Sequence, residues 1–209
     1  MSAGDAPTPA PRPDPHSIRR ATSLVLAARS GQLDAARAAL ADPSPRVRSA
    51  ALHALENAGA LLDDQLTAAM TDVDVAVRRD AAQLASVHPG APIIGLLDDD
   101  DSRVVEMACW AAGERVEGDA EAATTDRLCV IARDHSDALC REAAVAALGA
   151  IGRPDTADVV LAAMSDKATV RRRAVLALAA FNGPQIEAAL ETALTDRDWQ
   201  VRQAAEDLL

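Results

Sequence analysis

The chain is short of the large side chains that usually fill a globular core. Its 209 residues include one Phe, two Trp and no Tyr. Aromatic rings supply much of the buried area in ordinary cores, so their scarcity disfavours a sandwich or barrel built around bulky side chains. Small apolar side chains let helix axes approach closely, which favours stacked helical hairpins.

Cysteines and recognisable catalytic motifs are also few. Cys109, Cys129 and Cys140 are an odd number without a CxxC pair, which disfavours a disulfide framework or a zinc site and predicts reduced thiols in the cytoplasm. The four histidines form no HExxH motif and no His-Glu pair, and no GxSxG, GxGxxG or P-loop sequence is present. We therefore predict no catalytic residues, no metal and no cofactor.

Long apolar runs are missing as well. No run approaches the ~18 apolar residues that a membrane-spanning helix needs, and the first residues contain no signal-peptide core. Five prolines alternate with other residues between positions 7 and 15, a pattern that disfavours helix. We expect residues 1–15 to be a disordered, proline-rich leader and residues 16–209 to form one ordered domain of a cytoplasmic, monomeric protein.

Basic residues are fewer than acidic residues. The formal net charge is −11, and Lys167 is the single lysine among 21 basic residues. Nucleic-acid binding and adhesion to anionic membranes both require basic groups, so the overall charge disfavours them. A local basic strip remains compatible with an acidic chain.

What the chain does have is a repeated pattern. An acidic turn is followed six times by Val or Leu and then by an alanine-rich apolar stretch. The turns begin at Asp42, Asp72, Asp99, Asp134, Asp166 and Asp196, and the first apolar anchors are Val47, Val77, Val104, Leu139, Val170 and Val201. The anchors lie 30, 27, 35, 31 and 31 residues apart. Such spacing is typical of a solenoid, in which each repeat buries its apolar face against its neighbours.

Each repeat reads as a pair of helices. Small or apolar residues recur four and eight positions after each anchor, which places them on one face of a helix. We expect this second helix to begin just after each acidic turn. The first helices are expected near 32–41, 61–70, 91–97, 122–133, 155–164 and 185–194, after an initial helix over about 16–30. The sequence thus predicts an all-α solenoid of about six hairpins.

The residues of the turn resemble the HEAT repeat family, in its short bacterial form that is also called phycobilisome-lyase-like. The resemblance rests on a turn aspartate and an arginine six residues later, preceded by Val. The pairs Asp42/Arg48, Asp72/Arg78 and Asp196/Arg202 fit, and Asp166 is followed by Arg171 and Arg172. Two repeats differ from this pattern. The residue six positions after Asp99 is Val105, and the residue six positions after Asp134 is Cys140, which is followed by Arg141.

The resemblance covers about residues 18–209 and implies a right-handed superhelix with a ladder of ion pairs between neighbouring repeats. An arginine near the amino end of a helix opposes the helix dipole, so a nearby carboxylate is favourable. The two departures predict a looser or differently curved junction at the third and fourth repeats.

The resemblance also implies that the second helices line a concave surface where a partner binds. Positions two and six after each anchor point away from the buried face. Candidate partner-binding residues chosen on this basis are Trp110, Arg79, Glu106, Arg141, Arg172, Gln83 and His53. Trp110, Val145 and Leu176 would form an apolar row flanked by arginines. Trp110 fits the core equally well, and for Val145 and Leu176 we favour the core over the surface.

We therefore predict a non-catalytic scaffold or adaptor that binds another protein or a peptide. One alternative is an enzyme or enzyme accessory of the bilin-lyase-like HEAT class. Another is binding of an anionic ligand or nucleic acid through a row of arginines near the starts of the second helices. This arginine row comprises Arg46, Arg48, Arg78, Arg79, Arg103, Arg141, Arg171, Arg172, Arg173 and Arg202.

The run Asp98–Asp101 is the densest group of charges. Four carboxylates could attract a divalent cation, but their spacing does not match the alternating ligands of a calcium-binding loop. We interpret the run as a solvated turn whose last members cap the following helix.

Overall fold

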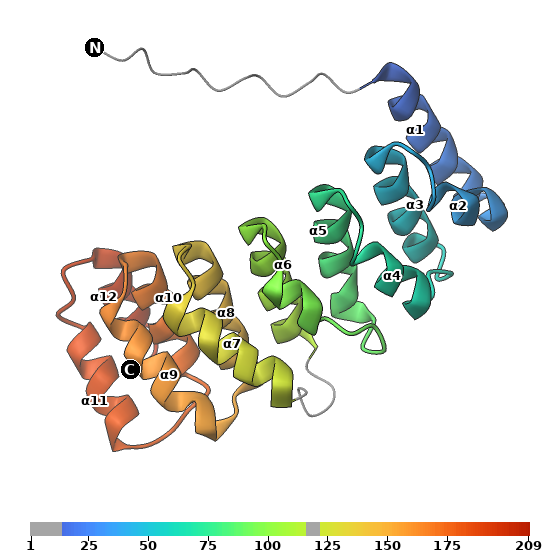
Figure 1. The fold of residues 1–209 in the computed structure, drawn as a ribbon. Helices are drawn as coiled ribbons and strands as arrows, with labels where there is room; N and C mark the ends of the chain where they lie inside the picture. The colour runs from blue at the N-terminus through green and yellow to red at the C-terminus, as the bar shows by residue number, and fades with distance from the viewer. Residues whose placement is uncertain (1–13, 116–121) are drawn as a thin grey trace, which may run out of the picture. The chain divides into compact units, whose positions relative to one another are not determined.

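The computed structural model describes residues 14–115 and 122–209. This part of the chain contains twelve α-helices and four short 3₁₀ helices. Figure 1 shows how the α-helices follow one another. The all-α class predicted from the sequence is therefore confirmed. The described residues divide into two compact units, one up to Leu61 and one from Leu62.

The first unit contains α1 (Pro15–Arg29), α2 (Leu33–Ala39) and α3 (Pro45–Asn57). The Asp14 carboxylate accepts hydrogen bonds from the backbone N–H groups of His16 and Ser17, and Pro15 occupies the first helical position. Both features are favourable at the start of a helix. Asp14 and Pro15 thus belong to the start of α1 and not to a leader, and residues 1–13 of the predicted leader lie outside the described residues.

The second unit begins with α4 (Asp63–Ala69), α5 (Val75–Leu84), η1 (Ala85–Val87), η2 (Ile94–Asp98) and α6 (Ser102–Glu114). It continues with α7 (Ala122–Asp134), α8 (Ala138–Ile151), η3 (Pro154–Thr156), α9 (Ala157–Ala162), η4 (Ala163–Ser165), α10 (Ala168–Leu178), α11 (Pro184–Ala193) and α12 (Trp199–Glu206). The predicted hairpins are present, and the first helix of the third hairpin is the 3₁₀ helix η2.

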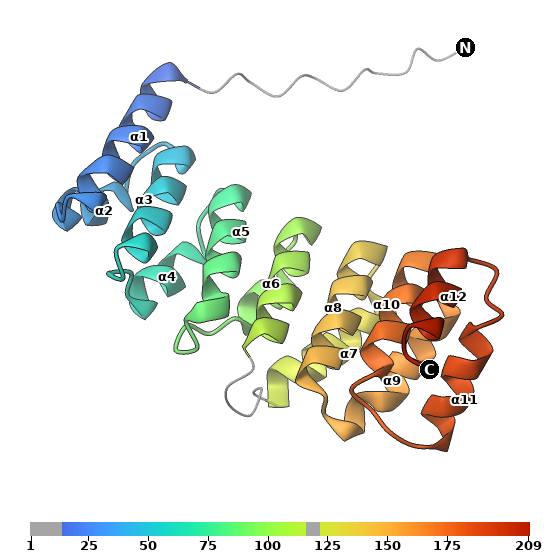
Figure 2. The same ribbon diagram turned by 180° about the vertical axis from the view of Figure 1, so that it is seen from behind.

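The second helices of these hairpins lie side by side. Figures 1 and 2 show α5, α6, α8, α10 and α12 in one layer, with α7, α9 and α11 packed against one side of it. In four of the six second helices the predicted stripe is buried throughout, as at Val104, Ala108 and Ala112. In α12 the third position, Leu209, lies beyond the end of the helix and is exposed.

In the fourth hairpin the predicted stripe is shifted by one residue. Leu139 is 53% exposed, whereas its neighbour Cys140 is fully buried and is followed by buried Ala144 and Leu148. The cause is the turn, which begins at His135 and not at Asp134. His135 Nδ1 accepts the backbone N–H of Asp137, as the first aspartate does in four of the other turns. A shift of one residue rotates a helix by about 100°, and Val145 accordingly lies in the core, which was the interpretation favoured for it over the surface row.

Among residues 14–115 and 122–209, every helix is too short or too polar to cross a membrane.

Candidate functional site: a groove around Trp110

The second helices share a feature at a fixed distance from their first residue. The fourth helical residue is Arg48, Arg78, Val105, Arg141, Arg171 and Arg202 in the six successive second helices. The arginine of the fifth repeat follows its aspartate by five residues because that turn is one residue shorter. Of the two arginines that follow Asp166, Arg171 and not Arg172 therefore takes the repeated position: Arg171 is buried and Arg172 is exposed.

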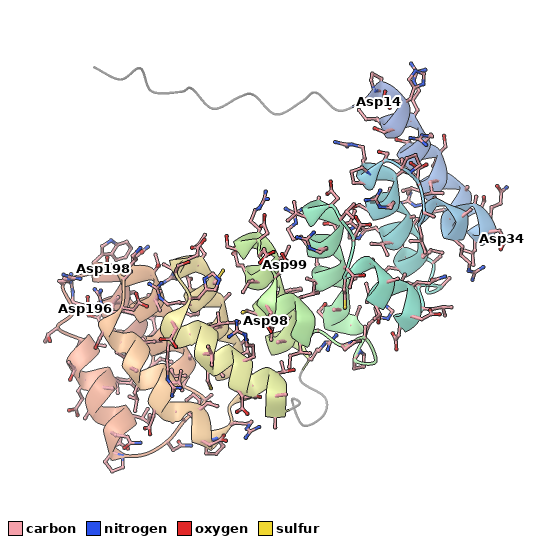
Figure 3. All side chains as sticks on the ribbon, viewed as in Figure 1. Asp14, Asp34, Asp98, Asp99, Asp196 and Asp198 are labelled. Carbon is pink, nitrogen blue, oxygen red and sulfur yellow. The ribbon has the colours of Figure 1, made fainter. Side chains whose placement is uncertain are left out.

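In the second unit these arginines link one turn to the next. Arg78 donates from Nε and Nη2 to the Asp99 carboxylate at 2.6 and 3.0 Å, and from Nη1 to the carbonyl of Asp72 at 2.9 Å. Asp99 lies at the turn before α6 (Figure 3). One guanidinium group thus binds the backbone of its own turn and makes a bidentate interaction with a carboxylate of the following turn.

The same arrangement recurs twice. Arg141 binds the carbonyl of His135 and the carboxylate of Asp166, at 2.6 and 2.7 Å from the two oxygens. Arg171 binds the carbonyl of Asp166 and the carboxylate of Asp196, at 2.8 and 2.7 Å. Arg141, a candidate for partner binding, is therefore part of this structural ladder, because the shifted turn places it at the fourth helical position.

Two further predicted ladder arginines bind the backbone carbonyl of their own turn. Arg48 donates from Nη1 to the carbonyl of Asp42 at 2.9 Å, and Arg202 donates to the carbonyl of Asp196 at 2.7 Å. The Asp42 carboxylate accepts from Arg20 of α1. The pairing of an arginine with the aspartate of its own repeat is thus a contact to the backbone carbonyl and not to the carboxylate.

One position of the ladder is apolar. Val105 takes the place of the arginine in α6 and is buried, and the following turn has His135 in place of aspartate. Instead, the Cys140 thiol donates to the carbonyl of Ser102 at 3.2 Å. The looser junction predicted here is not seen between α6 and α8, because a Cβ placed on Gly113 would lie 2.9 Å from the Cα of Ala147. The departure predicted for the fourth repeat is wrong, since Arg141 completes that repeat.

The ladder carboxylates are stronger acids than usual. The hydrogen bond from Arg141 lowers the pKa of Asp166 from its ordinary value of 3.8, and that from Arg171 does the same for Asp196. At Asp99 burial is the largest influence and acts to raise the pKa, but the hydrogen bonds from Arg78 and from the backbone N–H of Asp101, together with the charge of Arg78, outweigh it and the pKa is again lowered. A lowered pKa in the folded state stabilises the fold at pH values above 3.8, and this stabilisation is lost as the pH falls through the lowered values.

A groove of about 700 Å³ lies between α6 and α8 in the second unit. Its walls run along about two turns of each of these two helices, with one residue of α5 and one of α10 at the sides. The lining residues are Gln83, Glu106, Met107, Trp110, Glu114, Leu139, Glu142, Ala143, Ala146 and Arg173. A volume of this size falls in the range of ligand-binding clefts.

Helix periodicity explains the wall formed by α6. Glu106, Trp110 and Glu114 are four residues apart, so they lie on one face of the helix. Trp110 is 43% exposed, so of the two interpretations of this residue, core or surface, the surface is correct. Leu139 of α8 is also exposed, because the shifted fourth turn turns it away from the core.

The charge of the groove is negative. Three glutamates line it against one arginine, and Arg173 Nη2 lies 3.5 Å from the Glu142 carboxylate. Within residues 14–115 and 122–209, Glu106 and Glu114 have no ion-pair partner. The prediction of an apolar row flanked by arginines is therefore wrong for this surface.

The other candidates lie outside the groove lining. Gln83, Glu106 and Trp110 are the three candidates that the fold brings together there. Arg79 is exposed and lies 3.4 Å from Asp80, Arg172 is exposed, and His53 is half-buried in the first unit. Leu176 lines a shallower depression beside the groove.

Seven of the ten lining residues were not among the candidates, and Glu114, Leu139, Glu142 and Arg173 are the largest or charged ones among them. Glu114 could have been found by adding four to Trp110, since helix periodicity continues to the end of α6. Leu139, Glu142 and Arg173 depended on the true starts of α8 and α10, and Glu142 is two positions after the corrected anchor Cys140.

The predicted arginine row is largely paired. At least six of its ten members lie within ion-pair distance of a carboxylate, namely Arg78, Arg79, Arg103, Arg141, Arg171 and Arg173. Guanidinium groups that are already neutralised contribute little to binding phosphates, so the row offers little support for an anionic ligand.

The aspartate run is also divided among structural contacts. Asp98 lies 2.6 Å from Arg127, and Asp99 belongs to the ladder. Asp101 accepts the backbone N–H of Arg103 and caps α6, as predicted. In the part of the chain that the structure describes, no group of three or more His, Cys, Asp or Glu side chains is arranged to hold a metal ion.

The thiols are poor nucleophiles. Burial raises the pKa of the Cys109 thiol far above its ordinary value of 9.0, and it raises the pKa of Cys140 to about 11. Burial also raises the pKa of Cys129. Since the thiolate is the reactive form, these side chains stay protonated and unreactive near neutral pH.

Comparison with known proteins agrees with this repeat geometry. The family model described as HEAT repeats matches residues 125–209. A search of curated protein sequences finds no match. The fold is similar to Escherichia coli YibA, at a TM-score of 0.72 and 20% identity over 94% of this chain and 77% of that one.

Two further solved structures share the fold. The complex of CpcE and CpcF of phycocyanin lyase from Nostoc sp. matches at a TM-score of 0.58 and 21% identity, over 98% of this chain and 79% of that one. A designed armadillo repeat protein in complex with the peptide (KR)4 matches at 0.59 and 18% identity, over 91% and 96%. Residues 125–209 therefore match the HEAT-repeat family by sequence, and more than nine-tenths of the chain shares the helical-repeat fold of these structures.

Proposed function

We propose that this protein is a non-catalytic binding module, and that the groove between α6 and α8 holds a segment of another protein. The observation that supports this most directly is the exposed Trp110 side chain in a groove whose lining also includes the apolar residues Met107, Ala143 and Ala146. Exposed tryptophans in concave, partly apolar surfaces are frequent hot spots of protein interfaces.

The chemistry of the lining supports binding over catalysis. The groove contains carboxylates, an amide and one guanidinium, but no histidine, thiol or hydroxyl side chain. A nucleophile and a base within reach of each other are the usual requirement for covalent chemistry. The similarity to the phycocyanin lyase subunits is a similarity of fold, and it assigns a catalytic role to no residue of this groove.

The three cysteines are free, and we propose that the protein acts in the cytoplasm as a monomer. The designed armadillo protein, which shares the fold, was solved with a bound peptide. This precedent supports a protein or peptide as the partner.

Two tryptophan variants test the function. Trp110→Ala removes the ring from the groove, whereas Trp199→Ala removes an exposed ring at the start of α12, outside the groove. We expect Trp110→Ala to weaken binding of captured partners about 30-fold, since a hot-spot residue contributes about 2 kcal/mol, and Trp199→Ala to leave it unchanged. The measurement is affinity capture followed by titration of the purified partner segment.

Circular dichroism of both variants checks that the fold is retained. Equal partner binding by the wild type and Trp110→Ala would show that the groove is not the binding site.

A further inference from the structure

Resting on the proposed function, we propose that the segment bound in the groove is basic and extended, with arginine at alternate positions. In this arrangement one arginine stacks on Trp110, and its two neighbours on the same side pair with Glu106 and Glu114.

The charges of the groove favour a cationic ligand. Glu106 and Glu114 have no ion-pair partner among the described residues, and the only arginine of the lining is placed beside Glu142. The whole chain carries a formal net charge of −11, so the field at longer range also attracts a positively charged segment. An acidic segment would leave these carboxylates facing like charges.

The tryptophan favours arginine over lysine. Glu106, Trp110 and Glu114 form one stripe along α6, with the exposed ring between the two carboxylates. A guanidinium group stacks flat on an indole ring through cation–π attraction, and its planar fork also matches a carboxylate with two hydrogen bonds. A lysine ammonium makes the same ion pair as a point charge and stacks less well.

The spacing of the stripe favours an extended chain. Residues four apart in a helix are displaced by about 6 Å along its axis, so the two glutamates lie about 12 Å apart with Trp110 midway. Side chains on one side of an extended strand recur every two residues, or about 6.6 Å. The groove runs along α6 and α8, so three alternate side chains of an extended segment match the three positions of the stripe.

Three peptides of equal length test the chemistry of the ligand. The probe is fluorescently labelled Gly-Arg-Ser-Arg-Ser-Arg-Gly, and the comparisons replace every arginine by lysine or by glutamate. Fluorescence anisotropy with the full chain at about 50 mM salt is expected to show binding of the arginine peptide, severalfold weaker binding of the lysine peptide and none of the glutamate peptide. Salt at about 200 mM should weaken binding, because the ion pairs are solvent-exposed.

A matched pair of triple variants separates the groove from the overall charge. Glu106→Gln, Glu114→Gln and Glu142→Gln together are expected to raise the Kd of the arginine peptide at least tenfold, and so is Trp110→Ala. Glu187→Gln, Glu191→Gln and Glu206→Gln remove the same charge from exposed positions on α11 and α12, and should change the Kd less than twofold. Thermal unfolding of both triple variants verifies that each is folded.

Three results would overturn the inference. These are no binding of the arginine peptide, equal weakening by the two triple variants, or tighter binding of the glutamate peptide. If an uncharged or acidic segment binds in a way that requires Trp110, the proposed function stands and the basic ligand is wrong. If captured partners bind Trp110→Ala as they bind the wild type, the proposed function itself fails.

Discussion

The contact between α6 and α8 differs from the other contacts between successive second helices of the second unit. From α5 to α6, from α8 to α10 and from α10 to α12, an arginine at the fourth helical position binds an aspartate carboxylate of the next turn. In the contact from α6 to α8, Val105 occupies the position of the arginine and His135 occupies the position of the aspartate. Both partners of the ion pair are therefore replaced together.

The joint replacement has a clear physical reason. Removing one partner of a buried ion pair leaves the other charge without compensation, which costs several kcal/mol, whereas replacing both with well-packed neutral groups can be nearly neutral. Val105 is buried among apolar neighbours and His135 still accepts the N–H of Asp137. The contact between α6 and α8 thus dispenses with the ion pair and leaves no unpaired charge behind.

The largest effect is expected from breaking one ion-paired contact. Arg171→Ala should lower the free energy of unfolding by about 3 kcal/mol, because it leaves the Asp196 carboxylate and the Asp166 carbonyl without their partner. Arg172→Ala, at the exposed neighbouring position, should change it by less than about 0.5 kcal/mol. Urea unfolding followed by circular dichroism measures both, and equal effects would contradict the ladder.

An intermediate effect is expected from building the missing ion pair. Val105→Arg alone should destabilise the protein, because a guanidinium enters a buried position without a carboxylate. His135→Asp alone should have little effect, since aspartate accepts the same turn N–H elsewhere.

The double variant should recover at least about 1 kcal/mol relative to the sum of the single variants. A double-mutant cycle from urea unfolding gives this coupling energy. A coupling energy of zero would show that the contact between α6 and α8 differs in backbone geometry and not only in two side chains.

The smallest effect concerns close helix packing, which both kinds of contact share. A Cβ on Gly113 would lie 2.9 Å from the Cα of Ala147, and one on Gly149 would lie 2.8 Å from the Cα of Ala177. Alanine at either position should destabilise by about 1 kcal/mol net, as overpacking exceeds the gain in helix propensity. Gly95→Ala, with open space around the glycine, is the control. A large effect at Gly149 alone would tie close packing to the ion pairs.

The hairpins were predictable from the sequence because their periodicity is local. Val104, Ala108 and Ala112 recur at helical spacing, and the acidic turns contain the capping residues that start each second helix. The fourth hairpin shows the limit of this reasoning. Asp134 and His135 both begin plausible turns, and only the hydrogen bond from Asp137 to His135 distinguishes them. Because the turn begins at His135, Leu139 lies on the surface and Arg141 belongs to the ladder.

The groove was predictable in part. Glu106 and Trp110 follow from the face of α6 that points away from the core, and the structure places both in the lining. Its acidic character was not predictable, because the sequence does not show which arginines bind aspartates 21 to 25 residues away. Which carboxylates are neutralised depends on how neighbouring turns meet in space.

The sequence by itself determined the repeats, the helical pairs and the apolar faces that they bury, because periodicity and capping act over a few residues. The tertiary structure alone decided which arginine joins which aspartate, where the ladder gives way to apolar contact and which glutamates stay unpaired. Those outcomes depend on the distance between charges in adjacent repeats, and that distance is fixed only when the helices pack.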